Sequence, residues 1–195
     1  MTANRLATGL ALVLFGLAIS HAGAISLPAT RQPSDCTIAP MAIGDLQNLV
    51  AAGASSAATP GPSQTVTPEL TANIKGTIEE SVACTNANEP LRALALFTDG
   101  YLVVRFSGVG SDDLGHLAAA VTRDPAPAEP ADQLAILTIG DPKMLDDGRV
   151  SVIVETSNAS QDFADVLILA KVGDLWLIDE THSAMPNSST PTPLG

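Results

Sequence analysis

Basic side chains are scarce in this chain. Its 195 residues include 9 lysines and arginines against 21 aspartates and glutamates, which gives a formal net charge of −12. No basic cluster occurs, so the electrostatic footprint of a nucleic-acid-binding protein is missing. An anionic membrane surface would also repel this charge. The acids are scattered, and we interpret them as a solvated surface rather than an acidic recognition face.

Long apolar runs are also few, and the one at the N-terminus has a specific meaning. It extends from Leu6 to Ile19, follows Arg5, and precedes the sequence Ala22-Gly23-Ala24. This order is typical of a secretory signal with cleavage after Ala24. The alternative is an uncleaved N-terminal membrane anchor, but a membrane span needs about 20 apolar residues and this run is shorter. We therefore expect a secreted or extracytoplasmic protein with no stable membrane association after cleavage.

Cysteine is rare, with residues only at Cys36 and Cys84. An even count in an exported protein predicts a disulfide. In the chain-entropy model this bond is worth roughly 4 kcal/mol. A catalytic thiol needs a nearby base, and no histidine is close to either cysteine in sequence. A metal site needs more ligands at tighter spacing, so no metal is expected.

Composition divides the chain into four parts. These are a signal peptide at 1–24, a Pro/Ser/Thr/Ala-rich linker at 25–66, a folded domain at 67–182 and a disordered tail at 183–195. Within the linker, a short helix is indicated by the spacing of Ile43, Leu46, Leu49 and Val50.

The folded domain opens with helical patterns. Thr67 is a suitable N-cap and Pro68 a suitable first helical residue. The next apolar positions step by four and predict an amphipathic helix; they are Leu70, Ile74, Ile78 and Val82. A second helix, apolar nearly all round and therefore buried, begins at Pro90, and Asp99-Gly100 ends it. The segment 101–106 then favours a strand, with a continuing helix as the alternative, and 111–124 a short helix.

The second half of the domain has a β pattern. Strands are predicted at 134–139 and 149–156, with a turn at Asp147-Gly148. Gly173-Asp174 predicts a two-residue hairpin loop that places Leu169 opposite Ile178 and Ile168 opposite Asp179. Both faces of this hairpin are mostly apolar, whereas a sheet with one wet face alternates more cleanly. We therefore expect helices on one face and a cavity or a second subunit on the other.

These elements together resemble a known superfamily. Two helices, with the stretch CTNANEPLRALALFTDGYL, precede strands that finish in VLILAKVGDLWLIDE. Over about residues 67–182 this resembles the nuclear-transport-factor-like superfamily, the α+β cone fold shared by ketosteroid isomerases and polyketide cyclases. The resemblance implies a curved antiparallel sheet that wraps a pocket and packs against two or three N-terminal helices. It also implies pairing of sheets into homodimers.

Enzymes of this superfamily hold a carboxylate, often with Tyr or His, deep in the cone, where burial tunes its pKa. The catalytic candidates here are Asp99, Tyr101 and Asp179, and the ligand-binding candidates are Tyr101, Trp176 and Asp179. None matches a known enzyme's motif. Asp99 suits a turn or helix end, Tyr101 and Trp176 suit the core or a pocket wall, and Asp179 needs exposure or a hydrogen-bonding partner. Weaker candidates are His116, Glu180 and His182.

No acid, base and nucleophile converge in this sequence. This favours an exported, non-catalytic domain that binds a small apolar ligand or associates with itself or another protein, without a cofactor. The alternative is a small isomerase, dehydratase or cyclase that uses Asp99, Tyr101 and Asp179 as acid and base. A purely structural module is the third interpretation. An enzyme should bury a carboxylate of raised pKa beside a cavity, whereas a dimer module should cover the open sheet face.

Overall fold

The structure, a computed structural model, describes residues 31–53, 65–107, 111–122 and 126–184. The helices are η1 (Pro33–Asp35), α1 (Ile43–Ala52), α2 (Pro68–Asn86), α3 (Pro90–Leu94), α4 (Asp99–Ser107) and α5 (Ser111–Ala120). The strands are β1 (Ala135–Ile139), β2 (Lys143–Met144), β3 (Val150–Ser157), β4 (Asp162–Val172) and β5 (Leu175–Ser183). The predicted signal peptide and the tail beyond residue 184 lie outside the described residues.

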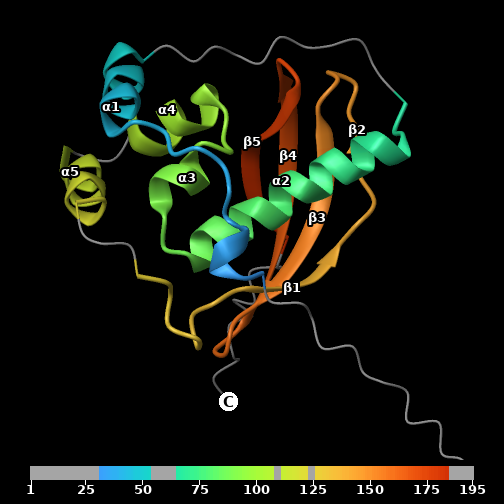
Figure 1. Cartoon of the computed structure of the whole chain (residues 1–195). Coiled ribbons are helices and arrows are strands. Elements are labelled where there is room, and N and C mark those ends of the chain that lie inside the picture. Colours follow the sequence, from blue (N-terminus) through green and yellow to red (C-terminus); the bar gives the residue numbers. More distant parts are fainter. Residues whose placement is uncertain (1–30, 54–64, 108–110, 123–125, 185–195) are drawn as a thin grey trace, which may run out of the picture.

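The strands form one antiparallel sheet with the order β1-β3-β4-β5, and the short β2 pairs with β3 beside β1. The sheet is curved and does not close on itself, and the helices pack against it (Figure 1). The predicted α+β fold with a cone-like curved antiparallel sheet and N-terminal helices is therefore confirmed.

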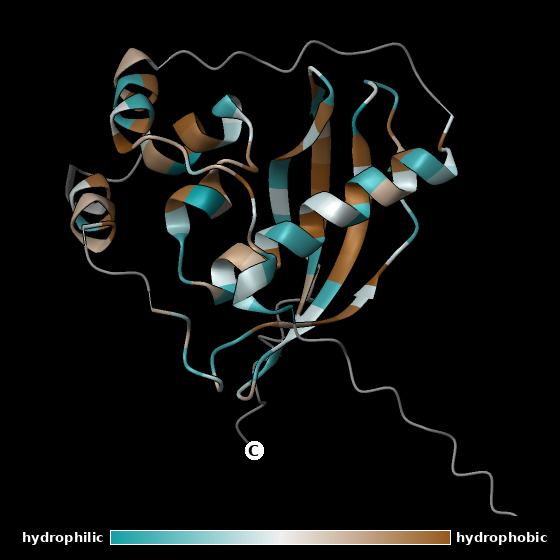
Figure 2. Cartoon of the chain, in the orientation of Figure 1, coloured by the Kyte–Doolittle hydropathy of each residue, from teal (hydrophilic) through white to brown (hydrophobic). Residues whose placement is uncertain are grey.

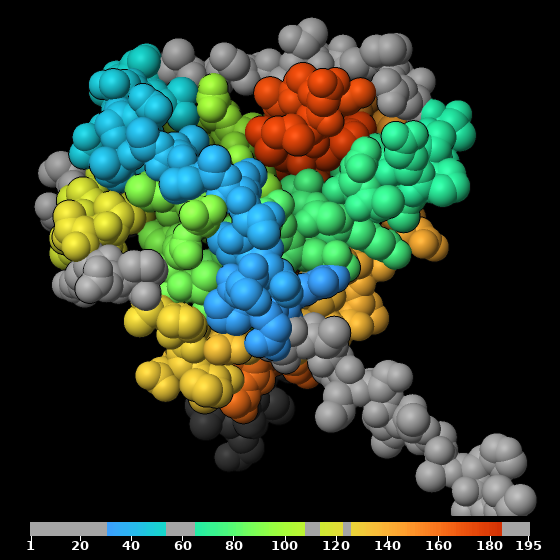
Figure 3. All heavy atoms as spheres, in the orientation of Figure 1, coloured from blue at the N-terminus to red at the C-terminus, as the bar shows by residue number. Residues whose placement is uncertain are grey.

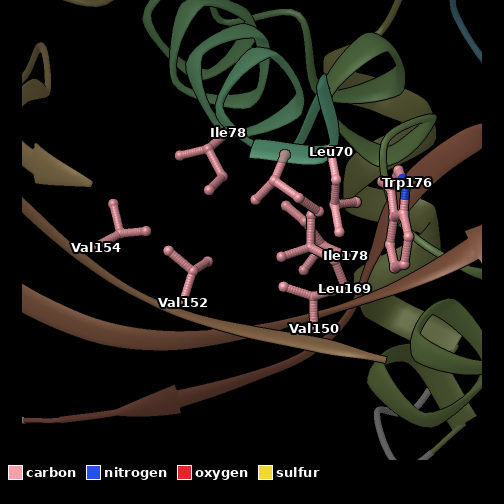
Figure 4. Packing of buried hydrophobic residues seen from close by; sticks show 9 residues of the cluster. Leu70, Ile78, Val150, Val152, Val154, Leu169, Trp176 and Ile178 are labelled. Atoms are coloured by element: carbon pink, nitrogen blue, oxygen red, sulfur yellow. The ribbon is translucent and has the colours of Figure 1, made fainter. Parts of the chain in front are cut away.

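Helix α2 lies across one face of the sheet, which we call the inner face (Figure 1). The first three residues of the predicted stripe on α2 and the alternate residues Val150, Val152 and Val154 of β3 are buried against each other (Figure 4). Leu169, Trp176 and Ile178 complete this core. Figure 2 shows the same arrangement as apolar colour concentrated on the strands behind α2. The interior of the cone is thus filled with side chains.

The start of α2 is fixed by the predicted cap. The Thr67 side chain accepts a hydrogen bond from the Leu70 backbone N–H at 3.1 Å, and Pro68 occupies the first helical position. This cap satisfies one of the free N–H groups of the first turn. The helix then places Ile74 and Ile78 on the sheet side, where both are almost fully buried.

The β4–β5 hairpin follows the predicted register for four pairs, from Val172–Leu175 to Leu169–Ile178. Gly173 has φ +61° in the loop, which is the left-handed conformation that a Gly-Asp loop requires. The register then shifts, and Ile168 pairs with Glu180 instead of Asp179. The predicted pairing of Ile168 with Asp179 was therefore wrong. A β-bulge makes Asp179 the extra residue and moves Glu180 onto the outer face with Ile168.

The segment around residue 98 also differs from its prediction. Helix α3 ends at Leu94 and none of its residues is fully buried. The backbone of 96–98 pairs with the free edge of β5: the Ile178 N–H donates to the Leu96 carbonyl, and the Thr98 N–H donates to the Ile178 carbonyl, both at 2.9 Å. Asp99-Gly100 begins α4, so 101–106 is helical and the predicted strand was wrong. Residues 96–98 are therefore extended and cover the free edge of β5, and the helix predicted to run on to Asp99 ends before them.

The N-terminal segment is tied to the helices. The predicted Cys36–Cys84 disulfide is present, with 4.7 Å between the two Cα atoms. The Glu80 carboxylate accepts hydrogen bonds from the backbone N–H groups of Thr37 and Ile38 at 3.1 and 2.7 Å. The predicted short helix is α1, which packs on α4. In Figure 3 this blue segment lies across the front of the molecule between α2 and the other helices.

The outer face of the sheet has no helix on it among the described residues. Ile153 of β3 is 50% exposed and Leu137 of β1 is 40% exposed. Val166 and Ile168 of β4 lie between these positions and β5 and are half-buried. These four residues form an apolar patch on the outer face. The sequence predicted a cavity or a second subunit on this face.

Candidate functional site

The helices beside β5 line an open pocket of about 320 Å³. It lies between the C-terminal end of α2 and helices α3, α4 and α5, which sit together on one side of the sheet (Figure 1). Its apolar lining is Pro90, Ala93, Leu94, Phe97, Phe106 and Leu117. Its remaining lining is Cys84, Thr85, Asn88, Glu89, Tyr101 and Arg105. Small-molecule sites combine such a mostly apolar wall with a few polar groups, and this volume is at the small end of their range.

Two aromatic rings form one wall of the pocket. Phe97 and Tyr101 are stacked with 4.6 Å between their ring centroids and 28° between their planes. They are brought together because Thr98 caps α4: its hydroxyl accepts from the Tyr101 N–H at 3.1 Å. The cap turns the chain from the β5 edge into the helix. Within the described part of the chain the Tyr101 hydroxyl has no hydrogen-bond partner, and because no buried polar side-chain atom there lacks one, this hydroxyl is reached by solvent.

The charged groups of the pocket differ in their pairing. Glu89 forms an ion pair with Arg92, which in turn donates to the Ile38 carbonyl. Arg105 lies over the Phe106 ring, with 5.7 Å from its guanidinium carbon to the ring centroid. It forms no salt bridge to any described residue. Among the described residues, Arg105 is therefore a cation of the pocket without an acidic partner.

A second polar cluster lies on the outer face around Arg149. The residue follows the Asp147-Gly148 turn, and its side chain crosses β4 to reach β5. The Nη1 group contacts Asp179 at 2.8 Å and also Glu180, while Nε contacts Asp147 at 2.8 Å. Val150, the first residue of β3, pairs with Leu169 of β4. Continuing this pairing by one residue places Arg149 opposite Ala170, which is only 1% exposed. The small alanine leaves room for the guanidinium stem above it.

The cluster lowers the pKa of two carboxyl groups, those of Glu180 and Asp147. The Arg149 guanidinium, followed by His182, lowers the pKa of Glu180, because both donate to its carboxylate. The Arg149 backbone N–H and then its side chain lower the pKa of Asp147. Hydrogen bonds to Glu180 above all raise the pKa of Arg149. A catalytic acid needs the opposite shift, so the cluster is suited to structure rather than to proton transfer at neutral pH.

The predicted site residues do not converge on one centre. Tyr101 lines the pocket. Asp99 is exposed in the first turn of α4, where a carboxylate suits the helix dipole. Asp179 accepts from the Thr98 hydroxyl at 2.7 Å and pairs with Arg149. Trp176 is 5% exposed in the core between α2 and the sheet. Thr98 connects two of these residues, because its hydroxyl donates a hydrogen bond to Asp179 and accepts one from the Tyr101 backbone N–H.

Sequence reasoning missed most of the pocket. Phe97, Arg105 and Phe106 were not proposed, because 101–106 was interpreted as a strand. Part of their signal is the spacing of Tyr101 and Arg105, which are four residues apart and so fall on one side of a helix, with Phe97 just before the cap Thr98. Thr98 followed by Asp99 is the start signal that would have identified this helix.

Neither cluster resembles a metal centre. Among the described residues, no group of three or more His, Cys, Asp and Glu side chains could hold a metal ion. In the same part of the chain, no helix combines the length and apolar character needed to cross a membrane. The disulfide fits an oxidising, extracytoplasmic compartment.

Comparison with known proteins finds no matching family, no matching curated protein and no matching solved structure.

Proposed function

We propose that this chain is an exported, non-catalytic binding domain whose pocket between α2, α3, α4 and α5 holds a small apolar ligand. The observation that carries the proposal is the pocket of about 320 Å³ with the stacked rings of Phe97 and Tyr101 in its wall. Aromatic walls bind apolar molecules through burial of area and favourable ring geometry. Membership of the nuclear-transport-factor-like superfamily stays a prediction, because no comparison bears on it.

The enzymatic alternative has less support. A general acid and base must both reach the reacting atoms. Of the proposed acid–base groups, Tyr101 alone lines the pocket, while Asp179 is held by Arg149 and Thr98. Glu89, the carboxylate of the pocket, is paired with Arg92. These contacts favour binding without chemistry.

The test is a fluorescence titration with the neutral apolar dye N-phenylnaphthylamine. Ala93→Phe fills the pocket from α3, whereas Ala72→Phe makes the same change at an exposed position of α2 outside it. We expect wild type and Ala72→Phe to bind the dye equally. Ala93→Phe should lose at least about tenfold in affinity, because the dye would have to displace a phenyl ring whose burial in the pocket is worth more than about 1.4 kcal/mol. Equal binding by both variants, with thermal unfolding showing that both fold, would contradict the proposal.

Self-association through the outer face is a second candidate function. Lys143 pairs with Ser151, Ser151 with Ile168, and Ile168 with Glu180, so these residues form one row across the sheet. A two-fold axis parallel to the strands would bring Lys143 of one copy opposite Glu180 of the other. It would also bury the exposed Ile153 against the same patch of the second copy. This charge complementarity favours a second copy as the occupant.

Sedimentation velocity over a range of protein concentrations tests this second candidate. We expect a dimer for wild type, and a monomer for Ile153→Glu, which places a charge in the middle of the apolar patch. Val104→Glu is the matched control, since Val104 is 75% exposed on α4. A wild-type monomer at all concentrations would rule out the dimer and leave the pocket proposal untouched.

A further inference from the structure

The charge balance of the pocket points to more than apolar binding. Its acid, Glu89, has a cationic partner in Arg92, but its cation, Arg105, has no acidic partner among the described residues. Arg105 is an exposed residue, and in a chain of net charge −12 it places a positive charge at the pocket. A bound anion would supply the missing partner.

The geometry of Arg105 suits this task. Its guanidinium lies 5.7 Å from the centroid of the Phe106 ring, within the range of a cation–π contact. A contact with the ring face uses none of the N–H donors of the guanidinium, so these donors remain available to a ligand. A planar carboxylate accepts from such a fork through two parallel hydrogen bonds. Phe106 therefore positions a carboxylate receptor at the pocket without using its donors.

The rest of the lining sets the other half of the ligand. The stacked rings of Phe97 and Tyr101, with Leu94 and Leu117, offer apolar surface. The free hydroxyl of Tyr101 adds a polar group that can orient the ligand. We propose that the pocket recognises an apolar carboxylic acid as its anion, with the carboxylate on Arg105 and the apolar body against Phe97 and Tyr101. This inference rests on the proposed ligand-binding function and names the class of ligand.

The test compares cinnamate with cinnamamide, two aromatic ligands of nearly the same shape that differ in charge. Calorimetric titration of the full chain gives the ratio of their affinities. We expect wild type to prefer cinnamate by about threefold to tenfold, because a charge-assisted pair at a partly exposed site retains only part of its strength. Arg105→Gln should abolish the preference by weakening cinnamate and leaving cinnamamide unchanged.

Two further variants separate charge in general from Arg105 in particular. Lys171→Gln removes one positive charge from an exposed strand position outside the pocket and should keep the full preference. Arg105→Lys retains the charge without the fork and should keep part of it. A preference that survives in Arg105→Gln, or that falls equally in Lys171→Gln, would overturn the assignment of Arg105.

The outcomes distinguish this inference from the function on which it rests. Equal binding of cinnamate and cinnamamide, both lost in Ala93→Phe, would overturn anion recognition and leave the apolar pocket in place. Binding of both ligands that Ala93→Phe does not affect would overturn the pocket itself. A chain that binds N-phenylnaphthylamine through the pocket but neither cinnamate nor cinnamamide would also overturn the inference about the carboxylate.

Discussion

At the scale of single residues, Arg149 and Arg105 have opposite surroundings. Arg149 forms ion pairs with Asp147, Asp179 and Glu180, so its positive charge is neutralised within the chain. Arg105 has a ring beneath it and no acid among the described residues. The first arrangement stabilises the turn before β3 and the bulge in β5, and the second leaves a donor for a ligand. The same residue type therefore serves structure in one cluster and, by our proposal, binding in the other.

Replacement of Arg149 by methionine should lower the free energy of unfolding by about 1 to 3 kcal/mol at neutral pH. Most of this comes from Asp179, whose side chain is 17% exposed, since Asp147 and Glu180 are more exposed and better screened. Urea unfolding measures the loss. Lys171→Met, at an exposed position, is the control and should stay within about 0.5 kcal/mol of wild type.

The Arg149 cluster also sets a pH dependence. Folding lowers the pKa of Glu180 and of Asp147 below their ordinary values of 4.5 and 3.8. Their contribution to stability is therefore complete above those values and is lost as the pH falls through the lowered, folded-state pKa values. We expect the stability gap between wild type and Arg149→Met to shrink steadily below about pH 4.5. A gap that widens on acidification would contradict this account.

At the scale of elements, local patterns predicted α2, β3 and the β4–β5 loop, because caps, periodicity and the Gly-Asp pair all act within a few residues. They did not predict α4, since Tyr101, Val103, Val104 and Phe106 are residues that strands also favour. Nor did they predict the bulge at Asp179. Both features depend on contacts distant in sequence: residues 96–98 pair with β5, and Asp179 bonds Thr98 and Arg149. The pocket depends on α4 and was missed for the same reason.

The same substitution in two elements should have opposite effects. Gly76 lies in the middle of α2 with open space around an added Cβ, so Gly76→Ala should raise the free energy of unfolding by about 0.5 to 1 kcal/mol. Gly173 also has open space, but its φ is +61°, so Gly173→Ala should lower it by about 1 kcal/mol through backbone strain alone. Thermal unfolding of both variants checks this pair, and changes of equal sign would contradict it.

At the scale of the whole molecule, the N-terminal segment and the helical side of the sheet form one body. The Cys36–Cys84 disulfide fastens residues 33–38 to α2, and Cys84 itself lines the pocket. Helix α1 packs on α4, which supplies Tyr101 and Arg105 to the same pocket. Sequence composition indicated a linker here because residues 25–40 are rich in Pro, Ser and Thr. The covalent bond and the Glu80 contacts hold a segment that has little core of its own.

Reduction of the disulfide should destabilise the domain by about 2 to 4 kcal/mol, since the bond spans 48 positions and restricts the unfolded chain. Urea unfolding with and without dithiothreitol measures this difference. The Cys36→Ala/Cys84→Ala double variant is the control: it should match the reduced protein and should not respond to the reductant. Equal stability of oxidised and reduced wild type would contradict the expectation.

The central claim is that the pocket between α2, α3, α4 and α5 is a ligand site, and a crystal structure of the protein with cinnamate tests it most directly. We expect density against Phe97 and Tyr101, with the carboxylate within hydrogen-bonding distance of Arg105. Density elsewhere on the chain, or a pocket that stays empty at saturating cinnamate and also at saturating N-phenylnaphthylamine, would contradict the claim and direct attention to the outer face of the sheet.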